Sequence, residues 1–282
     1  MAVIDIEAEF DNRSRVPEHP EFFARWTREA AAFREAALAE GRAELGISYG
    51  PSPRQYLDLF QAPGTGPAPV ALFIHGGYWR ALDPSLFSQM AKGPGAHGLT
   101  VAVAGYDLCP QVTILEIVAQ MRRACLTLWD RFKRPLFVYG HSAGGHLAGA
   151  MLATDWPALR ADVPPHLVQA AYSISGLFDL APLVQTSMNA DLRLDLPEAR
   201  RASPLYWPAP TGLTFDAVVG GDESNAFIEQ SRIIAETWRQ RGVETRYEAI
   251  AGANHFSVID PLSNPDSAMT RRVVELAQAV KA

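Results

Sequence analysis

The stretch PLFVYGHSAGGHLA, residues 135–148, joins a run of apolar residues to a run of small ones. The apolar part, Pro135–Tyr139, predicts a buried strand, and the residues from Ser142 to about Ala153 predict a helix. Between them lies a G-x-S-x-G pentapeptide centred on Ser142. A serine at a sharp strand-to-helix turn needs small neighbours, which Gly140 and Gly144 provide. The context favours a nucleophile elbow over its alternative, a glycine-rich turn with an ordinary N-cap serine.

Strand and helix patterns alternate on both sides of this turn. Apolar runs predict further strands at Val70–Ile74, Leu99–Ala104, Val168–Ile174 and Phe215–Val219, with shorter or more polar ones at Gln55–Phe60 and Glu244–Ala249. Helical spacing is predicted over residues 21–45, 113–132, 227–241 and 267–280. Continuous apolar strands that alternate with helices require cover on both faces of a parallel sheet. The sequence therefore predicts a doubly wound α/β fold, with a mostly parallel central sheet.

Length and composition limit the organisation of the chain. Its 282 residues are 48% hydrophobic and 20% charged, which excludes wholesale disorder. No linker or repeat is visible, so we expect a single domain over residues 1–282, with an N-terminal helical segment at about 18–46. A proline-rich stretch at about 180–214 interrupts the alternation, and its length predicts a small cap-like insertion.

Charge and cysteine content exclude several classes of function. The net charge is −6 and the arginines are scattered, which argues against nucleic-acid binding. Cys109 and Cys125 fit no metal-binding spacing and are expected to be free thiols. The N-terminus lacks the apolar core of a secretory leader, and no run is long enough for a membrane span. We therefore expect a cytoplasmic protein without membrane contact.

A second motif, His75-Gly76-Gly77-Tyr78-Trp79, follows the strand Val70–Ile74. Two glycines let the backbone turn its amides toward the serine, and acyl transfer needs N–H donors aimed at the developing negative oxygen. We therefore predict an oxyanion hole made of the N–H groups of Gly77, Tyr78 and Ala143. The alternative is a tight turn that uses two glycines.

A serine nucleophile needs a base and a group that orients the base. Of the seven histidines, His255 follows the last predicted strand and lies in a loop of small residues, which is the position of the base in this chain order. The alternative is a surface-loop histidine. The acid is expected just after the strand Phe215–Val219, where Asp222 and Glu223 compete; spacing from the preceding glycine favours Glu223 and leaves Asp222 open.

Together these motifs resemble the α/β-hydrolases of the kynurenine formamidase (arylformamidase) type, which are related to hormone-sensitive-lipase-like esterases. The resemblance extends to Ser175–Leu180, Glu223-Ser224 and Asn254–Phe256. It implies Ser142 as nucleophile, Glu223 as acid and His255 as base, with no cofactor or metal. It also implies formyl-arylamines, other aryl amides or short carboxylesters as substrates.

Aromatic residues favour an aromatic substrate, although each alone is more often part of a core. The predicted contacts are Tyr78, Trp79, Phe178, Trp207 and Phe256, with Tyr206 beside them. The aromatic face of the first predicted helix could cover the site or pack on a second copy in a homodimer.

Three hypotheses follow. The first is a serine hydrolase of N-acyl or N-formyl arylamines, and the second is a carboxylesterase with the same residues. The third is a catalytically silent fold that serves as a receptor or scaffold.

Overall fold

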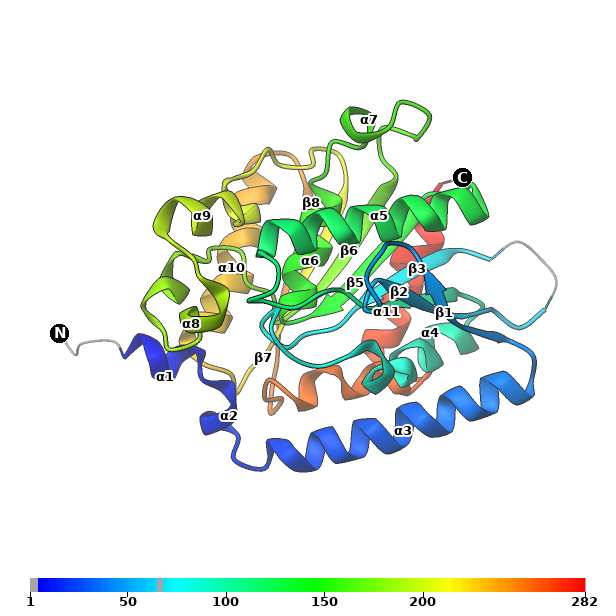
Figure 1. Cartoon of the computed structure of the whole chain (residues 1–282), viewed down its shortest axis with the longest axis horizontal. Coiled ribbons are helices and arrows are strands. Elements are labelled where there is room, and N and C mark those ends of the chain that lie inside the picture. The colour runs from blue at the N-terminus through cyan, green and yellow to red at the C-terminus, as the bar shows by residue number, and fades with distance from the viewer. Residues whose placement is uncertain (1–4, 65–67, 282) are drawn as a thin grey trace.

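The computed structural model describes residues 5–64 and 68–281 (Figure 1). The sequence-based expectation that the N-terminal stretch is not a secretory leader includes residues 1–4, which lie outside this range. The strands are β1 (Ala43–Ser48), β2 (Tyr56–Phe60), β3 (Val70–Ile74), β4 (Thr100–Ala104), β5 (Leu136–His141), β6 (Val168–Ile174), β7 (Thr214–Gly220) and β8 (Glu244–Ile250). The main helices are α3 (His19–Ala39), α5 (Ile114–Phe132), α6 (Ala143–Leu152), α10 (Asn225–Gln240) and α11 (Ala268–Ala279).

Shorter helices lie at the N-terminus and between the main elements. They are α1 (Ile6–Phe10), α2 (Asn12–Arg15), α4 (Lys92–Ala96), α7 (Trp156–Leu159), α8 (Asn189–Leu192) and α9 (Leu196–Arg201). Short 3-10 helices are η1 (Pro84–Leu86), η2 (Ser88–Ala91), η3 (Ala181–Gln185), η4 (Pro204–Tyr206) and η5 (Ser257–Ser263).

The described strands form one sheet in the order β1-β2-β4-β3-β5-β6-β7-β8. β1 pairs with β2, and β2 with β4, in antiparallel register, whereas every pair from β4 to β8 is parallel. The prediction of a mostly parallel sheet is confirmed. Because ligands bind at the carboxyl ends of strands in such sheets, the loops after β3, β5, β6, β7 and β8 are the ones that matter for function.

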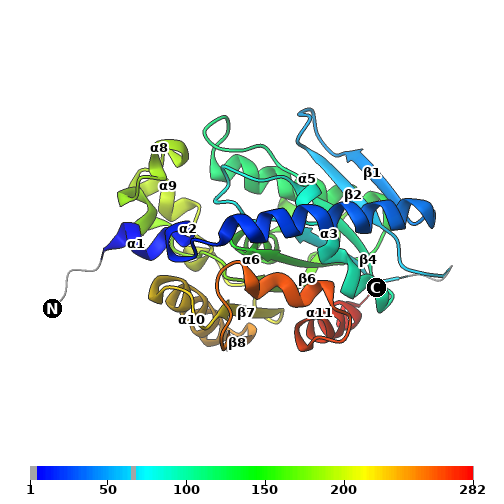
Figure 2. The same ribbon diagram turned by 90° about the horizontal axis from the view of Figure 1, so that it is seen from below.

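Alternate residues of the central strands enter two separate cores, one on each face of the sheet. In β3, Leu72 packs with α5 and α6 on one face, and Phe73 packs with α3 and α11 on the other. Figures 1 and 2 show these helices on opposite sides of the sheet. Arg272 of α11 is fixed to the sheet by an ion pair with buried Asp216 of β7, 2.7 Å between Nε and Oδ2.

The prediction of a helix over residues 21–45 was wrong at its C-terminal end. α3 stops at Ala39, and Gly41 adopts a φ of +66° that an L side chain rarely takes. The N–H of Arg42 then bonds back to the Ala37 carbonyl, and the chain leaves as the edge strand β1. Leu45 and Ile47 are alternate residues of that strand. The helix predicted as far as residue 45 overlapped its beginning.

A helical region lies between β6 and β7, in the part of the chain where the sequence predicts an insertion. It consists of η3, α8, α9 and η4, and Figures 1 and 2 place it beside α1 and α2 at one end of the molecule. His146 of α6 connects it to the main fold, because its Nε2–H donates to the Ala202 carbonyl at 2.7 Å.

Cys109 and Cys125 are free and buried. Within residues 5–64 and 68–281, we find no helix whose length and apolar character would carry it through a bilayer.

Candidate active site

The turn around Ser142 has the strain that its motif predicts. Ser142 has φ 56° and ψ −118°, and its N–H donates to the Ile174 carbonyl at 2.8 Å. A Cβ on Gly144 would lie 1.9 Å from the Ile74 carbonyl oxygen, and one on Gly140 would lie 2.3 Å from the Gly144 oxygen. Only glycine fits at these two positions. The backbone thereby holds Ser142 at the end of β5, directly before α6.

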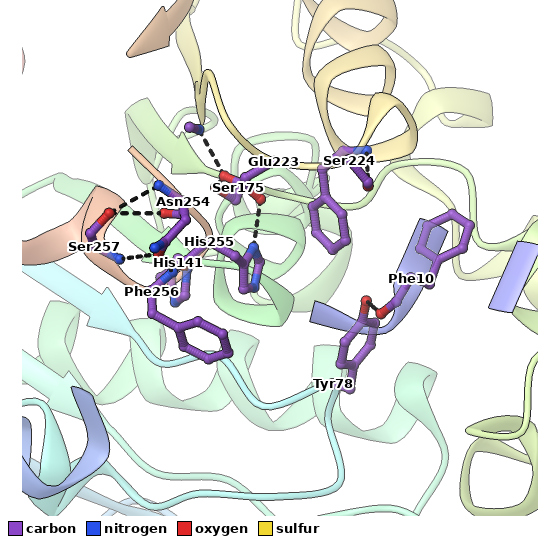
Figure 3. Close-up of polar contacts among 12 residues, drawn as sticks. Phe10, Tyr78, His141, Ser175, Glu223, Ser224, Asn254, His255, Phe256 and Ser257 are labelled. Carbon is purple, nitrogen blue, oxygen red and sulfur yellow. Dashed lines mark hydrogen bonds and ion pairs between the residues drawn. The ribbon is translucent and has the colours of Figure 1, made fainter. Parts of the chain in front are cut away.

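His255 and Glu223 form a buried pair at the ends of β8 and β7. The Nδ1–H of His255 donates to Glu223 Oε2 at 2.6 Å, which leaves Nε2 as the basic nitrogen of the neutral ring. The other oxygen, Oε1, accepts from the Gly220 N–H at 2.7 Å and from the Ser175 hydroxyl (Figure 3). Asp222 is exposed. Of the two carboxylates that the sequence left open, Glu223 is therefore the one that contacts the histidine.

The loop that carries His255 is fixed by short-range hydrogen bonds. Asn254 Oδ1 accepts from the backbone N–H groups of Phe256 and Ser257, both at 2.9 Å (Figure 3). The Nε2–H of His141 donates to the His255 carbonyl at 2.8 Å. Burial, together with the nearby His255, lowers the pKa of His141 well below its usual value, so His141 acts as a neutral hydrogen-bond donor.

The loop after β3 passes directly against Ser142. A Cβ on Gly76 would lie 3.0 Å from Ser142 Cβ. Gly77 and Tyr78 both have positive φ values, +111° and +50°. His75 supports this turn: its Nδ1–H donates to the Gly76 carbonyl at 2.7 Å, its ring stacks on Tyr106, and burial lowers its pKa to about 4.

A cavity of about 220 Å³ contains the proposed reacting groups. Ser142, His255, Gly77 and Tyr78 all line it, and Ala143 lies directly beyond Ser142 as the first residue of α6. The remaining wall residues are Glu7, Phe10, Asp11, Asn12, Arg13, Phe23, Trp26, Arg80, Ala81, Leu82, His141, Ser187, Met188 and Phe256. The aromatic face of α3 therefore contributes to the cavity through Phe23 and Trp26.

The predicted aromatic contacts divide into two groups. Tyr78 and Phe256 line the cavity, whereas Trp79, Phe178 and Trp207 lie outside it. Trp79 is buried with its ring edge-to-face with His146, and Phe178 packs on Phe215. Trp207 donates its Nε1–H to the Arg201 carbonyl in the insertion. Trp79 and Phe178 lie outside the cavity because they are packed in the hydrophobic core beneath the motif loops. Tyr206 is 52% exposed and donates to Asp179 Oδ2.

Sequence reasoning missed the N-terminal wall of the cavity, residues 7–13. The Tyr78 hydroxyl donates to the Phe10 carbonyl at 2.6 Å (Figure 3). Glu7 accepts from the N–H and hydroxyl of Ser187 in the insertion. The available signal was the spacing of Asp5 and Asp11, whose carboxylates cap α1 and α2.

The side chains and backbone groups of the site are those used in acid–base and nucleophilic catalysis. Within the described residues, no three or more His, Cys, Asp or Glu side chains are grouped so that they could hold a metal ion. A serine in a strained turn, a buried imidazole with a carboxylate on Nδ1, and glycine-rich backbone beside the serine are the components of acyl transfer.

Comparison with known proteins supports this fold. A family model described as alpha/beta hydrolase fold matches residues 71–258. The chain is 30% identical to kynurenine formamidase of Drosophila melanogaster over 89% of this chain and 86% of that protein, and 26% identical to the Danio rerio kynurenine formamidase over 86% and 84%. A crystal structure from a Silicibacter species, provisionally named a thioesterase, has a TM-score of 0.85 and 32% identity, and covers 96% of this chain and 99% of that one.

The chain therefore belongs to the α/β-hydrolases and is a hydrolase enzyme. Within them it is of the arylformamidase type, as its formamidase relatives and the extent of their alignment establish.

Proposed function

We propose that this enzyme cleaves the N–C(=O) bond of a small N-acyl or N-formyl arylamine, or of a related aryl amide, through an acyl-enzyme on Ser142. The observation that carries the proposal is the buried His255–Glu223 pair, whose His255 lines the same cavity as Ser142. The kynurenine formamidase relatives and the aromatic wall residues support the substrate class.

The mechanism follows from the position of each proton. Nε2 of His255 takes the Ser142 hydroxyl proton as the oxygen attacks the carbonyl carbon, and the N–H groups of Gly77, Tyr78 and Ala143 donate to the resulting oxyanion. The imidazolium, stabilised by Glu223, then protonates the leaving amine, and the C–N bond breaks. In the second half of the cycle, His255 removes a proton from a water molecule, whose oxygen attacks the acyl-enzyme. The imidazolium then donates that proton to the Ser142 oxygen as the acid product leaves.

Protonation of the leaving group decides between amides and esters. An amine anion is a very poor leaving group, so amide cleavage needs the proton from His255 far more than ester cleavage does. A carboxylester, or a thioester of the kind suggested by the name of the Silicibacter protein, would use the same groups with less demand on that step.

A substrate panel tests the proposal. We would measure kcat/KM on matched 4-nitrophenyl acetate and 4-nitroacetanilide, on N-formylkynurenine, and on an acetyl thioester. Turnover of the formyl and acetyl anilides with kcat/KM within a few orders of magnitude of the ester is expected. Ester or thioester turnover without measurable anilide turnover would reject the amide assignment.

The nucleophile is tested separately with a fluorophosphonate probe. Labelling is expected on Ser142 of the wild-type chain and absent from Ser142→Ala, whose fold is retained because only one oxygen is removed. A folded wild-type protein that resists the probe would instead favour the silent receptor or scaffold hypothesis.

A further inference from the structure

Phe227 is a buried phenylalanine whose ring packs against the imidazole of His255. The two ring centroids lie 4.7 Å apart, and the ring planes are inclined at 61°. Phe227 is 0% exposed and lies outside the wall of the cavity that contains Ser142. A ring in this place does not meet a substrate bound in the cavity, so it acts on the reaction through the side chains that it touches.

The hydrogen bond on one nitrogen does not by itself aim the imidazole. The Nδ1–H of His255 donates to Glu223 Oε2 at 2.6 Å (Figure 3). This contact fixes the distance between Nδ1 and the carboxylate, but the ring can still tilt about it and swing Nε2 away from Ser142. A misplacement of about 1 Å can lower a rate about 100-fold. The imidazole therefore needs packing contacts that fix its inclination.

Three aromatic rings pack against the imidazole of His255. Besides Phe227, His141 has its ring centroid at 4.7 Å and Phe256 at 5.6 Å from the imidazole centroid. His141 also donates to the His255 carbonyl, and Phe256 is the next residue of the same loop. Phe227, by contrast, comes from α10 and supplies packing alone. Its contribution to the orientation of the base can therefore be tested without breaking a hydrogen bond of the site.

One turn of the chain supplies both the carboxylate and the ring. Glu223 directly precedes Ser224, the N-cap of α10, and Phe227 is the third residue of that helix. The Ser224 hydroxyl accepts from the Phe227 N–H at 3.3 Å, which fixes Phe227 relative to Glu223. The Phe227 ring packs in turn on Phe10 at 5.9 Å and on Tyr78 at 6.5 Å between centroids. With its backbone capped and its ring enclosed, Phe227 is a rigid support.

We infer that Phe227 is a positioning residue that holds the imidazole of His255 at the inclination needed for proton transfer with Ser142 and the leaving group. This inference rests on the proposed function, in which His255 is the base. The apolar ring beside the buried pair also excludes water, which strengthens the hydrogen bond between Glu223 and the imidazolium. Catalytic groups supported in this way by packed neighbours keep their geometry throughout the cycle.

The test is Phe227→Leu, which keeps an apolar side chain and removes the flat ring. We expect kcat to fall about 10- to 100-fold on both 4-nitroacetanilide and 4-nitrophenyl acetate, because His255 carries the proton in both reactions. KM should change less than about threefold, since Phe227 is not part of the cavity wall. Phe60→Leu is the matched control: Phe60 in β2 is 2% exposed and packs on Phe33 at 5.0 Å. It should lower the melting temperature to a similar extent and leave kcat unchanged.

A spectroscopic readout separates positioning from general destabilisation. The proton between His255 and Glu223 should give a far-downfield NMR resonance, assigned by its loss in His255→Gln. We expect this resonance to broaden in Phe227→Leu, where the imidazole is held less firmly, and to stay sharp in Phe60→Leu. Phe227→Met, whose unbranched side chain adapts to irregular space, provides the same readouts should the leucine variant not fold.

The contrary outcomes are distinct. An unchanged kcat in Phe227→Leu would overturn the inference, as would equal losses of kcat in Phe227→Leu and Phe60→Leu. A rise in KM without a fall in kcat would overturn it by assigning Phe227 to substrate binding. A wild-type enzyme that turned over the ester and not the anilide would reject the amide assignment alone, and the ester kcat would then decide the role of Phe227. A wild-type enzyme inactive on every substrate would overturn the proposed function and this inference together.

Discussion

At the scale of single residues, two adjacent carboxylates have different surroundings. Glu223 is buried and accepts hydrogen bonds from His255, Gly220 and Ser175, whereas Asp222 faces solvent. The longer glutamate side chain reaches back from the loop to the end of β7, which an exposed neighbour cannot do. The spacing in the sequence favoured Glu223, but only the fold shows which side chain turns inward.

Glu223→Gln is expected to lower kcat by about 10³- to 10⁴-fold, because an amide can no longer stabilise the imidazolium and can favour the wrong tautomer of His255. Asp222→Asn should change kcat less than about twofold. Steady-state kinetics on one anilide check both variants. A larger loss in Asp222→Asn would reassign the acid.

The Ser175 hydroxyl donates to Glu223 Oε1, so we predict that Ser175 positions this carboxylate. Ser175→Ala should lower kcat about tenfold and leave KM nearly unchanged, since the substrate cavity is intact while the carboxylate is less well oriented. Ser173→Ala, in β6 two residues before Ser175, is the control: within the described residues the Ser173 hydroxyl has no partner. Equal effects in the two variants would mean that packing at the end of β6, not orientation of Glu223, is responsible.

At the scale of elements, long apolar patterns were predictable and short polar ones were not. β3 and β6 were predicted at their observed bounds, and β5 and α5 within two residues, because their apolar runs or stripes are long. β1 was missed because its first three residues fall within the helix predicted over residues 21–45. α1 and α2 were missed because each has about one turn, and tertiary contacts rather than intrinsic propensity stabilise such helices. The cavity wall that they build was therefore missing from the predicted site.

The close contact of β5, α6 and β3 at the elbow gives a prediction for Gly144→Ala. Its Cβ would lie 1.9 Å from the Ile74 carbonyl oxygen, so the backbone must move. We expect a loss of about 1–3 kcal/mol in the free energy of unfolding, with most of the activity lost. Gly95→Ala in α4 is the matched control, since its Cβ would meet nothing within 4 Å. Chemical denaturation of both variants checks this, and equal stabilities would contradict the close contact.

At the scale of the whole molecule, buried neutral histidines connect the loops and the insertion to the core. His141 holds the His255 loop, and His146 holds the insertion through the Ala202 carbonyl. His75 holds the turn that contains Gly77. Burial lowers the pKa of His75 and of His146 to about 4, and that of His141 well below its usual value. The positions of the His255 loop, the insertion and the turn that contains Gly77 therefore all depend on histidines that stay uncharged.

This arrangement makes stability depend on pH. In the unfolded chain these histidines take up protons as the pH falls below about 6.5, whereas the folded chain resists protonation until the pH nears 4. Folding stability is therefore fully present above pH 6.5 and decreases between pH 6.5 and 4. Each such histidine contributes a loss of about 1.4 kcal/mol between pH 7.5 and pH 5.5.

His146→Gln retains a donor for Ala202 and cannot titrate, so its loss over this interval should be smaller by about 1.4 kcal/mol. Urea denaturation at the two pH values measures the difference, with exposed His166→Gln as control. Equal losses in His146→Gln and the wild-type chain would show that His146 is protonated as readily in the folded state as in the unfolded one.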